Sequence, residues 1–190
     1  MAASSAAASE ASGRTTEDMM TLVDPLIPAL RRYARTLLRD RANADDLVQD
    51  CLERVVTYWH QRRSAATARA WVFTILHNLA MSRLRQGARR GFSVPLEDVD
   101  EGALARPPDQ EHGLRRQDVL RALDRLPDEQ RSVLLLVSVE DLSYAETAAA
   151  LDIPIGTVMS RLARAREKLL RDMEGNAAGA APRPTLRRVK

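Results

Sequence analysis

Basic and small polar side chains recur at helical spacing between residues 155 and 173. They are Thr157, Ser160, Arg161, Arg164 and Lys168. Arginine and lysine neutralise backbone phosphates, and an arginine fork can also donate two hydrogen bonds to the edge of a guanine. Small polar residues that open the same helix can approach bases closely. This face is therefore typical of a surface that reads duplex DNA.

Two predicted helices and a tight turn position that face. Ser143 followed by Glu146 forms a capping box, which predicts a helix start, and Pro154 predicts a break at Ile153. A second helix should run from Ile155 to about Met173. Its apolar stripe comprises Val158, Leu162, Ala165, Leu169 and Met173. The alternative is a helical hairpin with an ordinary solvated face, but the small residue Ala148 permits the close crossing of a helix-turn-helix.

A predicted helix from Ala44 to about Trp59 carries a second candidate surface, with Asn43 as its expected N-cap. Its buried face should comprise Leu47, Cys51, Val55 and Tyr58, with Val48, Leu52 and Trp59 alongside, and its other face is acidic. Acids in a first turn complement the helix dipole, but Asp50 and Glu53 lie beyond that turn. This pattern favours a basic protein partner over a solvated face.

The predicted helix from Ala68 to Arg90 follows a basic loop and combines arginines with aromatic residues. From Arg54 to Arg90 the chain has eight arginines and no acid. Positive charge interleaved with flat rings suits single-stranded nucleic acid. We expect Tyr33 and Phe73 to be core residues, while Trp59 and Trp71 could be core or stacking residues.

The 190 residues contain 45% hydrophobic but only 4% aromatic side chains, which favours an all-α fold built on Leu, Ala and Val. We predict a disordered tail (1–20), a helical domain (21–90), a flexible acidic linker (91–110), a helix-turn-helix domain (111–174) and a flexible basic tail (175–190). The first helix of the chain should start between Asp24 and Pro28. Helices 111–126 and 128 onward should precede the helix-turn-helix, with the apolar run 133–137 at the centre of the C-terminal core.

Composition and motifs also argue against other classes of protein. The single cysteine, Cys51, excludes an intramolecular disulfide, and the three scattered histidines give no metal set. No nucleophile arrangement or phosphate-binding loop suggests an enzyme, and no cofactor is expected. The sequence has no apolar run long enough to span a membrane and no signal peptide, so we expect a cytoplasmic protein.

Four segments resemble the extracytoplasmic-function (ECF) sigma factors of bacterial RNA polymerase. Segment 43–56 (NADDLVQDCLERVV) is similar to the core-binding helix of the family's region 2, and 69–78 (RAWVFTILHN) to the helix after it. Segments 126–131 (LPDEQR) and 156–166 (GTVMSRLARAR) are similar to the start and the recognition helix of region 4. The resemblance spans residues 22–172 in the family's order. Departures are Thr147, Asp152, Met159 and Ala163, which concern the turn and the promoter preference rather than the fold.

The resemblance implies three partners, which are core RNA polymerase, promoter DNA and an anti-sigma factor. Core polymerase would be contacted at its β′ clamp helices and its β subunit. The polymerase-binding residues implied are Asp45, Asp46, Leu47, Gln49, Asp50 and Glu53. Those implied at the minus-ten element are Arg62, Arg63, Arg69, Trp71, Asn78, Arg83, Arg85 and Arg89. Those implied at the minus-thirty-five element are Arg131, Thr157, Ser160, Arg161, Arg164 and Lys168. Two alternatives are a sigma-like decoy that binds an anti-sigma factor and a stand-alone helix-turn-helix regulator.

Overall fold

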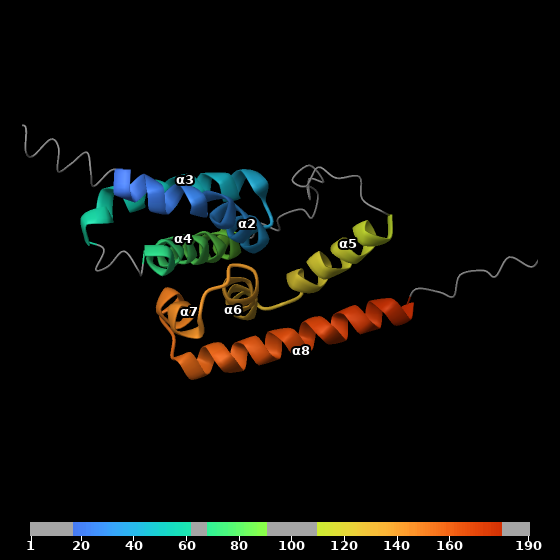
Figure 1. Cartoon of the computed structure of the whole chain (residues 1–190). Coiled ribbons are helices and arrows are strands. Elements are labelled where there is room, and N and C mark those ends of the chain that lie inside the picture. The colour runs from blue at the N-terminus through green and yellow to red at the C-terminus, as the bar shows by residue number, and fades with distance from the viewer. Residues whose placement is uncertain (1–16, 62–67, 91–109, 180–190) are drawn as a thin grey trace, which may run out of the picture.

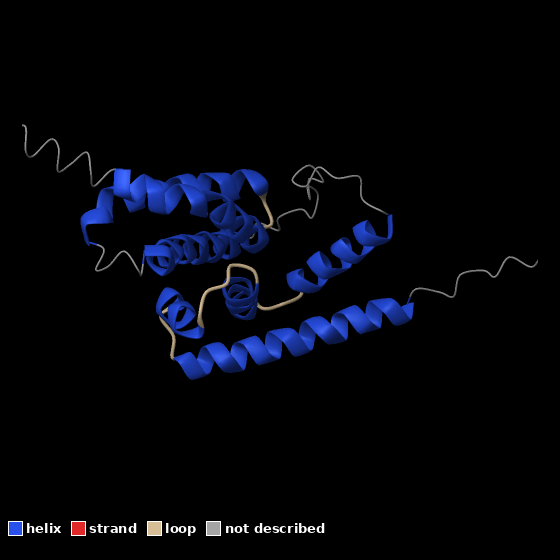
Figure 2. Ribbon diagram, in the orientation of Figure 1, coloured by secondary structure: helices blue, strands red, loops and turns tan. Residues whose placement is uncertain are grey.

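The computed structural model describes residues 17–61, 68–90 and 110–179 (Figure 1). Within these ranges every regular element is a helix and none is a strand, which confirms the all-α prediction (Figure 2). The predictions for the linker, the basic loop with Arg62 and Arg63, most of the N-terminal tail and residues 180–190 lie outside the described residues. Residues 17–20 and 175–179 are helical, so the two predicted tails are shorter at those ends.

The N-terminal helices pack around a core of aliphatic and aromatic side chains. A helical segment 17–23 leads into the 3₁₀ turn η1 (Asp24–Leu26), followed by α2 (Ile27–Leu38), α3 (Arg41–Tyr58), η2 (Trp59–Gln61) and α4 (Ala68–Arg90). Pro25 and Pro28 occupy first-turn positions, where the missing N–H costs nothing. Tyr33 and Phe73 are fully buried and meet edge-on at 5.7 Å, which confirms both as core residues.

The start of α3 differs from the sequence prediction. Asp40, rather than Asn43, is the N-cap, and its carboxylate accepts a hydrogen bond from the backbone N–H of Asn43 at 3.0 Å. Both residues are good N-caps. Arg39 supplies the left-handed residue (φ 58°) that ends α2, so the turn is tighter than expected and α3 begins three residues earlier.

The C-terminal helices are α5 (Gln110–Asp124), α6 (Asp128–Ser138), α7 (Tyr144–Leu151) and α8 (Ile155–Gly179). The capping box of Ser143 and Glu146 is present, and its hydrogen bonds lower the pKa of Glu146. Asp152 adopts the left-handed conformation (φ 53°) that ends α7, a position that Asp tolerates better than most residues. The predicted helix-turn-helix is therefore confirmed.

Helix α8 is six residues longer than expected, and its apolar stripe fades toward its end. Val158, Leu162 and Ala165 are buried, Leu169 is half-buried, and Met173 is exposed rather than buried. In Figure 1, α5 runs beside this later part of α8, and the two helices contact each other. A two-helix pair cannot cover the last turns as fully as α6 and α7 cover the first.

The two groups of helices pack directly against each other. Helix α4 contacts α7, and α2 contacts α6, as Figure 1 shows with α2–α4 on one side of α6 and α7. The apolar run 133–137 serves both sides: Val133 and Leu134 pack against Val158 and Leu162 of α8, while Leu135 and Leu136 join the core of α2–α4. The prediction that this run centres a separate C-terminal core is thus only half correct.

Candidate polymerase and nucleic-acid interfaces

One side of α3 presents the exposed polar residues Asp46, Gln49 and Glu53. Their spacing of three and four residues places them on one helix face, and the Gln49 amide donates to the Glu53 carboxylate at 3.3 Å. Leu47 is fully buried. Its side chain therefore belongs to the core under this face and not to the exposed surface.

The remaining acids of α3 form ion pairs within the N-terminal helices. Asp45 pairs with Arg35 at 3.1 Å, and Asp50 pairs with Arg83 of α4. Arg83 also donates to the carbonyl of Asn43 at 2.6 Å. Asp50 and Arg83, expected at two different binding surfaces, instead hold α3 against α4.

The acidic face continues into a hollow at the end of α3 that the sequence reasoning missed. Its lining residues are Asp50, Glu53, Arg54, Thr57 and Tyr58. The helical pattern places both Tyr58 and Trp59 on the buried face, but Tyr58 is 46% exposed and only Trp59 is buried. Val56 beside it is also exposed. The only signal in the sequence was the pair of adjacent aromatics, Tyr58 and Trp59, because the end of a helix buries only one of two neighbouring side chains.

The predicted minus-ten residues of α4 do not form one continuous surface. Asn78 and Arg85 are exposed, while Trp71 is half-buried and packs edge-on against the buried Trp59 at 6.2 Å. The Arg69 guanidinium donates to the backbone carbonyl of Glu140, beyond the end of α6. The side chain of Arg89 lies outside the described residues. Trp59 is thus a core residue, and Arg69 is occupied by the C-terminal helices.

The polar residues at the start of α8 differ in their exposure and in their contacts. Ser160 and Arg164 are exposed, Thr157 is half-buried, and the Arg161 guanidinium lies 2.5 Å from the carboxylate of Glu129 on α6. Lys168 is half-buried, and its ammonium donates to the carbonyl of Arg125 at 2.6 Å. Ser160 and Arg164 are therefore the exposed members of this set.

Two departures from the family pattern lie on the same exposed face of α8. Met159 is 49% exposed, and Ala163 is exposed as well. Thr147 of α7 is instead fully buried, and its hydroxyl has no hydrogen-bond partner. The first two substitutions can alter what the face reads, whereas the third affects only the interior.

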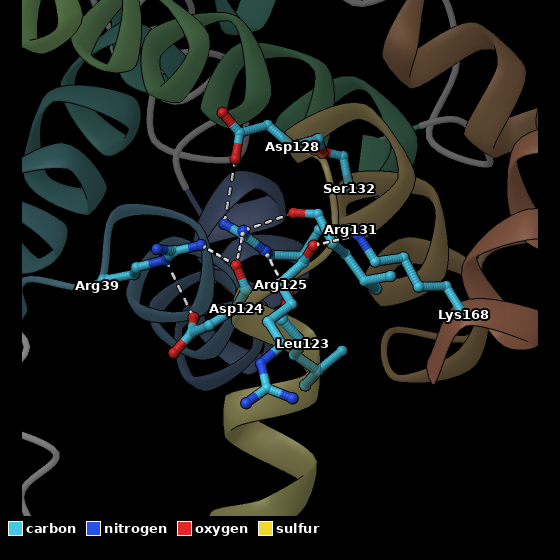
Figure 3. Close-up of polar contacts among 9 residues, drawn as sticks. Arg39, Leu123, Asp124, Arg125, Asp128, Arg131, Ser132 and Lys168 are labelled. Atoms are coloured by element: carbon cyan, nitrogen blue, oxygen red, sulfur yellow. Dashed lines mark hydrogen bonds and ion pairs between the residues drawn. The ribbon is translucent and has the colours of Figure 1, made fainter. Parts of the chain in front are cut away.

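Arg131, predicted at the minus-thirty-five element, is buried and is bound to the end of α5 and to α6 (Figure 3). Its side chain is 1% exposed. Nε donates to the carbonyl of Leu123 at 2.9 Å, and Nη2 donates to those of Asp124 at 3.1 Å and Leu126 at 2.8 Å. Nη1 pairs with Asp128 at 3.2 Å. Burial lowers the pKa of Arg131, and the carbonyls at the end of α5 compensate its charge as a helix C-terminus does.

A cavity of about 520 Å³ lies between part of α4 and the C-terminal helices. Arg85 and His77 line it from α4, and Arg161, Asp128 and Glu129 line it from the opposite side. A predicted minus-ten residue and a predicted minus-thirty-five residue therefore face one cavity. The described residues hold no group of three or more metal-ligating side chains.

His77 gives the protein a pH dependence that can be measured. Its Nδ1 lies 3.0 Å from the Tyr33 hydroxyl, and burial, reinforced by the charge of Arg161, lowers the pKa of His77 to about 4. In the unfolded chain, His77 therefore binds a proton near its ordinary pKa of 6.5. In the folded protein, it binds that proton only near its lowered pKa of about 4. Stability from neutral His77 is complete above pH 6.5 and is lost as the pH falls toward 4.

We expect wild-type protein to lose about 2–3 kcal/mol more between pH 6.5 and 4 than the non-titrating variant His77→Gln. Urea denaturation at a series of pH values gives both curves. The carboxylates and arginines around the cavity, including Arg85, Arg161, Asp128 and Glu129, are common to both proteins and cancel in the difference. Parallel curves would show that His77 does not titrate as its surroundings require.

The arrangement of a helical N-terminal unit and a capped helix-turn-helix defines a class of DNA-associated protein, and comparison with known proteins specifies it. Residues 23–77 match the family model "Sigma2 domain of PhyR", and residues 116–169 match "Sigma-70, region 4". The chain is 37% identical over 146 residues to the ECF RNA polymerase sigma factor EcfG of Rhodopseudomonas palustris, covering 75% of this chain and 78% of that one. It is 38% identical to SigM of Mycobacterium tuberculosis over 142 residues, covering 75% and 70%. The chain belongs to the ECF RNA polymerase sigma factors.

Solved structures agree with this membership. The sigma factor RpoE of Bartonella quintana, in complex with the anti-sigma factor NepR, superposes with a TM-score of 0.68 at 30% identity, covering 83% of this chain and 98% of that one. CnrH, in complex with the cytosolic domain of CnrY, gives 0.60 at 25% identity, covering 83% and 88%. We refer below to residues 21–90 as region 2 and to residues 111–174 as region 4. No helix among the described residues is long and apolar enough to cross a membrane.

Proposed function

We propose that this protein binds core RNA polymerase through the exposed face of α3 and directs it to promoters, where region 2 engages the minus-ten element and region 4 the minus-thirty-five element. It would act in the cytoplasm as an initiation factor, and the polymerase would catalyse all bond formation. The observation that carries the proposal is the capped turn into α8, with Ser160 and Arg164 exposed at the start of that helix. Exposed donors on the first turns of a second helix can enter a major groove.

Transcription reconstituted from purified parts tests this function. Core polymerase plus this protein should start transcripts at a defined site of a genomic library fragment, and core polymerase alone should not. The sigma factor RpoE is bound by the anti-sigma factor NepR in a solved complex, and we propose that an anti-sigma factor binds this chain as well. The alternative of a sigma-like decoy makes a different prediction. A decoy would bind the anti-sigma factor and start no transcript.

Replacing Arg164 by alanine should lower affinity for the upstream promoter element about tenfold and relax its sequence preference. An arginine on a base edge discriminates by roughly 1–3 kcal/mol, whereas a phosphate contact weakens all sequences alike. Arg171 is the matched control, because it is exposed two turns further along α8 and should affect affinity less and preference not at all. Competition binding against scrambled DNA at several salt concentrations separates the two effects. Equal losses in both variants would argue against base readout by Arg164.

A further inference from the structure

Glu140 is a buried carboxylate at the contact between regions 2 and 4. It lies between α6 and α7 and is 1% exposed. Arg32 of α2 donates two hydrogen bonds to it, from Nε to Oε1 at 2.9 Å and from Nη2 to Oε2 at 2.7 Å. The carboxylate raises the pKa of Arg32. This parallel two-bond geometry is the strongest form of arginine–carboxylate pairing.

The backbone around Glu140 holds its side chain toward region 2. After α6 ends, the N–H of Glu140 donates to the carbonyl of Leu135 at 2.9 Å, and that of Leu142 donates to Leu136 at 2.9 Å. Asp141 between them takes the left-handed conformation (φ 51°). Leu135, Leu136 and Leu142 enter the core of region 2 on either side. In this arrangement the turn presents the Glu140 carboxylate to α2 and the Glu140 backbone carbonyl to α4.

Two further arginines of region 2 bind region 4. Arg69 donates to the backbone carbonyl of Glu140, so the same residue is held from α2 and from α4. Arg39 pairs with the carboxylate of Asp124, with Nε 3.0 Å from Oδ1. Figure 3 shows this second contact beside the buried Arg131. Regions 2 and 4 are thus joined by charged contacts at two places and by apolar packing between them.

This closed arrangement cannot span a promoter. Elements centred near minus ten and minus thirty-five are about 25 base pairs apart, or roughly 85 Å of straight duplex. Here Arg85 of α4 and Arg161 of α8 line one cavity, and Arg69 is occupied by region 4. Promoter binding requires the contact between regions 2 and 4 to break.

We propose that Glu140 is the latch that holds the free protein closed, through Arg32 and Arg69, and that core polymerase with promoter DNA opens it. On opening, the ion pair between the Glu140 carboxylate and the Arg32 guanidinium breaks, and water hydrates both groups. Arg69 then becomes available to bind DNA phosphates. The closed state itself follows from the contacts, while its opening by polymerase rests on the proposed function. Because only the open fraction of the protein can occupy both promoter elements, the closed state lowers the apparent affinity for promoter DNA.

Single-molecule Förster resonance energy transfer between two dyes tests the latch. The dyes are attached to cysteines introduced at the exposed residues Ala42 of α3 and Ala149 of α7. Cys51 is buried, and burial raises the pKa of its thiol to about 12, so it labels slowly. We expect the free wild-type protein to show mainly high transfer. Glu140→Gln, which keeps the shape and removes the charge, should lower the ratio of closed to open molecules at least tenfold.

Three further variants keep the result interpretable. Glu167→Gln removes a carboxylate that pairs with Arg171 within α8 and should leave the transfer distribution unchanged. Arg32→Glu should open the protein, and combining it with Glu140→Arg should restore part of the closed population. Circular dichroism establishes that each variant is folded.

The outcomes separate the latch from the proposed function. A wild-type protein that is open in solution, or a Glu140→Gln variant as closed as wild type, overturns the latch. If Glu140→Gln opens the free protein as expected but core polymerase and promoter DNA leave the wild type closed, the opening step and the proposed function fail, while the role of Glu140 in closing the free protein stands. Opening by polymerase, faster or at lower concentration in Glu140→Gln, supports both.

Discussion

Replacing Arg131 by alanine is expected to lower the free energy of unfolding by about 3–5 kcal/mol. The substitution leaves the carbonyls of Leu123, Asp124 and Leu126 without the donors that now satisfy them. Each buried, unsatisfied group costs about 1–3 kcal/mol, and the lost side chain adds a cavity between α5 and α6. Urea denaturation followed by helical circular dichroism measures the change.

Two comparisons identify the cause of that loss. Arg125, close by in the same bend, is exposed, and Arg125→Ala should change stability by less than about 0.5 kcal/mol. Arg131→Lys keeps the charge but replaces a planar fork with a point donor, so its stability should fall between wild type and alanine. If Arg131→Ala is as stable as Arg125→Ala but binds DNA more weakly, the original assignment of Arg131 to DNA is right.

Local signals in the sequence predicted the elements that carry the helix-turn-helix. Ser143 and Glu146 satisfy each other's backbone groups within one turn, and Pro154 acts only on its neighbours. The start of α4 at Ala68 and of α6 at Asp128 likewise agree with the sequence. Such signals involve residues that are three or four positions apart, so they need no knowledge of the tertiary fold.

The surroundings that the sequence did not predict depend on contacts between distant segments. Arg131 looked like one more cation near a DNA-binding motif, but the bend after α5 brings carbonyls around it. Leu135 and Leu136 are indistinguishable from Val133 in the sequence, yet they enter another core. Arg32 and Glu140 are 108 residues apart, and no pattern within either helix marks them as partners. Helical periodicity predicts which face is buried, not what covers it.

The candidate polymerase surface shows the same division between local and tertiary information. The sequence identified an acidic face on α3, and the structure divides it into two sets. Asp50 lies against Arg83 of α4, so reversing its charge would disturb packing as well as any partner. Asp46 and Glu53 are exposed and seven residues apart on one face. They are therefore the better pair for testing polymerase binding.

The double variant Asp46→Lys, Glu53→Lys should bind core polymerase two to three orders of magnitude more weakly than wild type. Placing like charges against a basic partner costs several kcal/mol, and tenfold in affinity corresponds to about 1.4 kcal/mol. Stability should change little, because exposed charges contribute at most about 1 kcal/mol per pair. Binding is measured with labelled protein and core polymerase in the absence of DNA, at low and high salt. The difference should shrink as salt screens the charges.

A matched control on α8 separates this surface from net charge. Glu167 and Glu174 are also exposed and seven residues apart, so Glu167→Lys, Glu174→Lys produces the same change in charge at the same spacing. This variant should retain near wild-type affinity for polymerase in the absence of DNA. Equal weakening by both variants would mean that polymerase responds to the overall charge of the chain. Wild-type affinity in the α3 variant would mean that the polymerase binds elsewhere, and the exposed hollow at Arg54, Thr57 and Tyr58 would then be the next surface to alter.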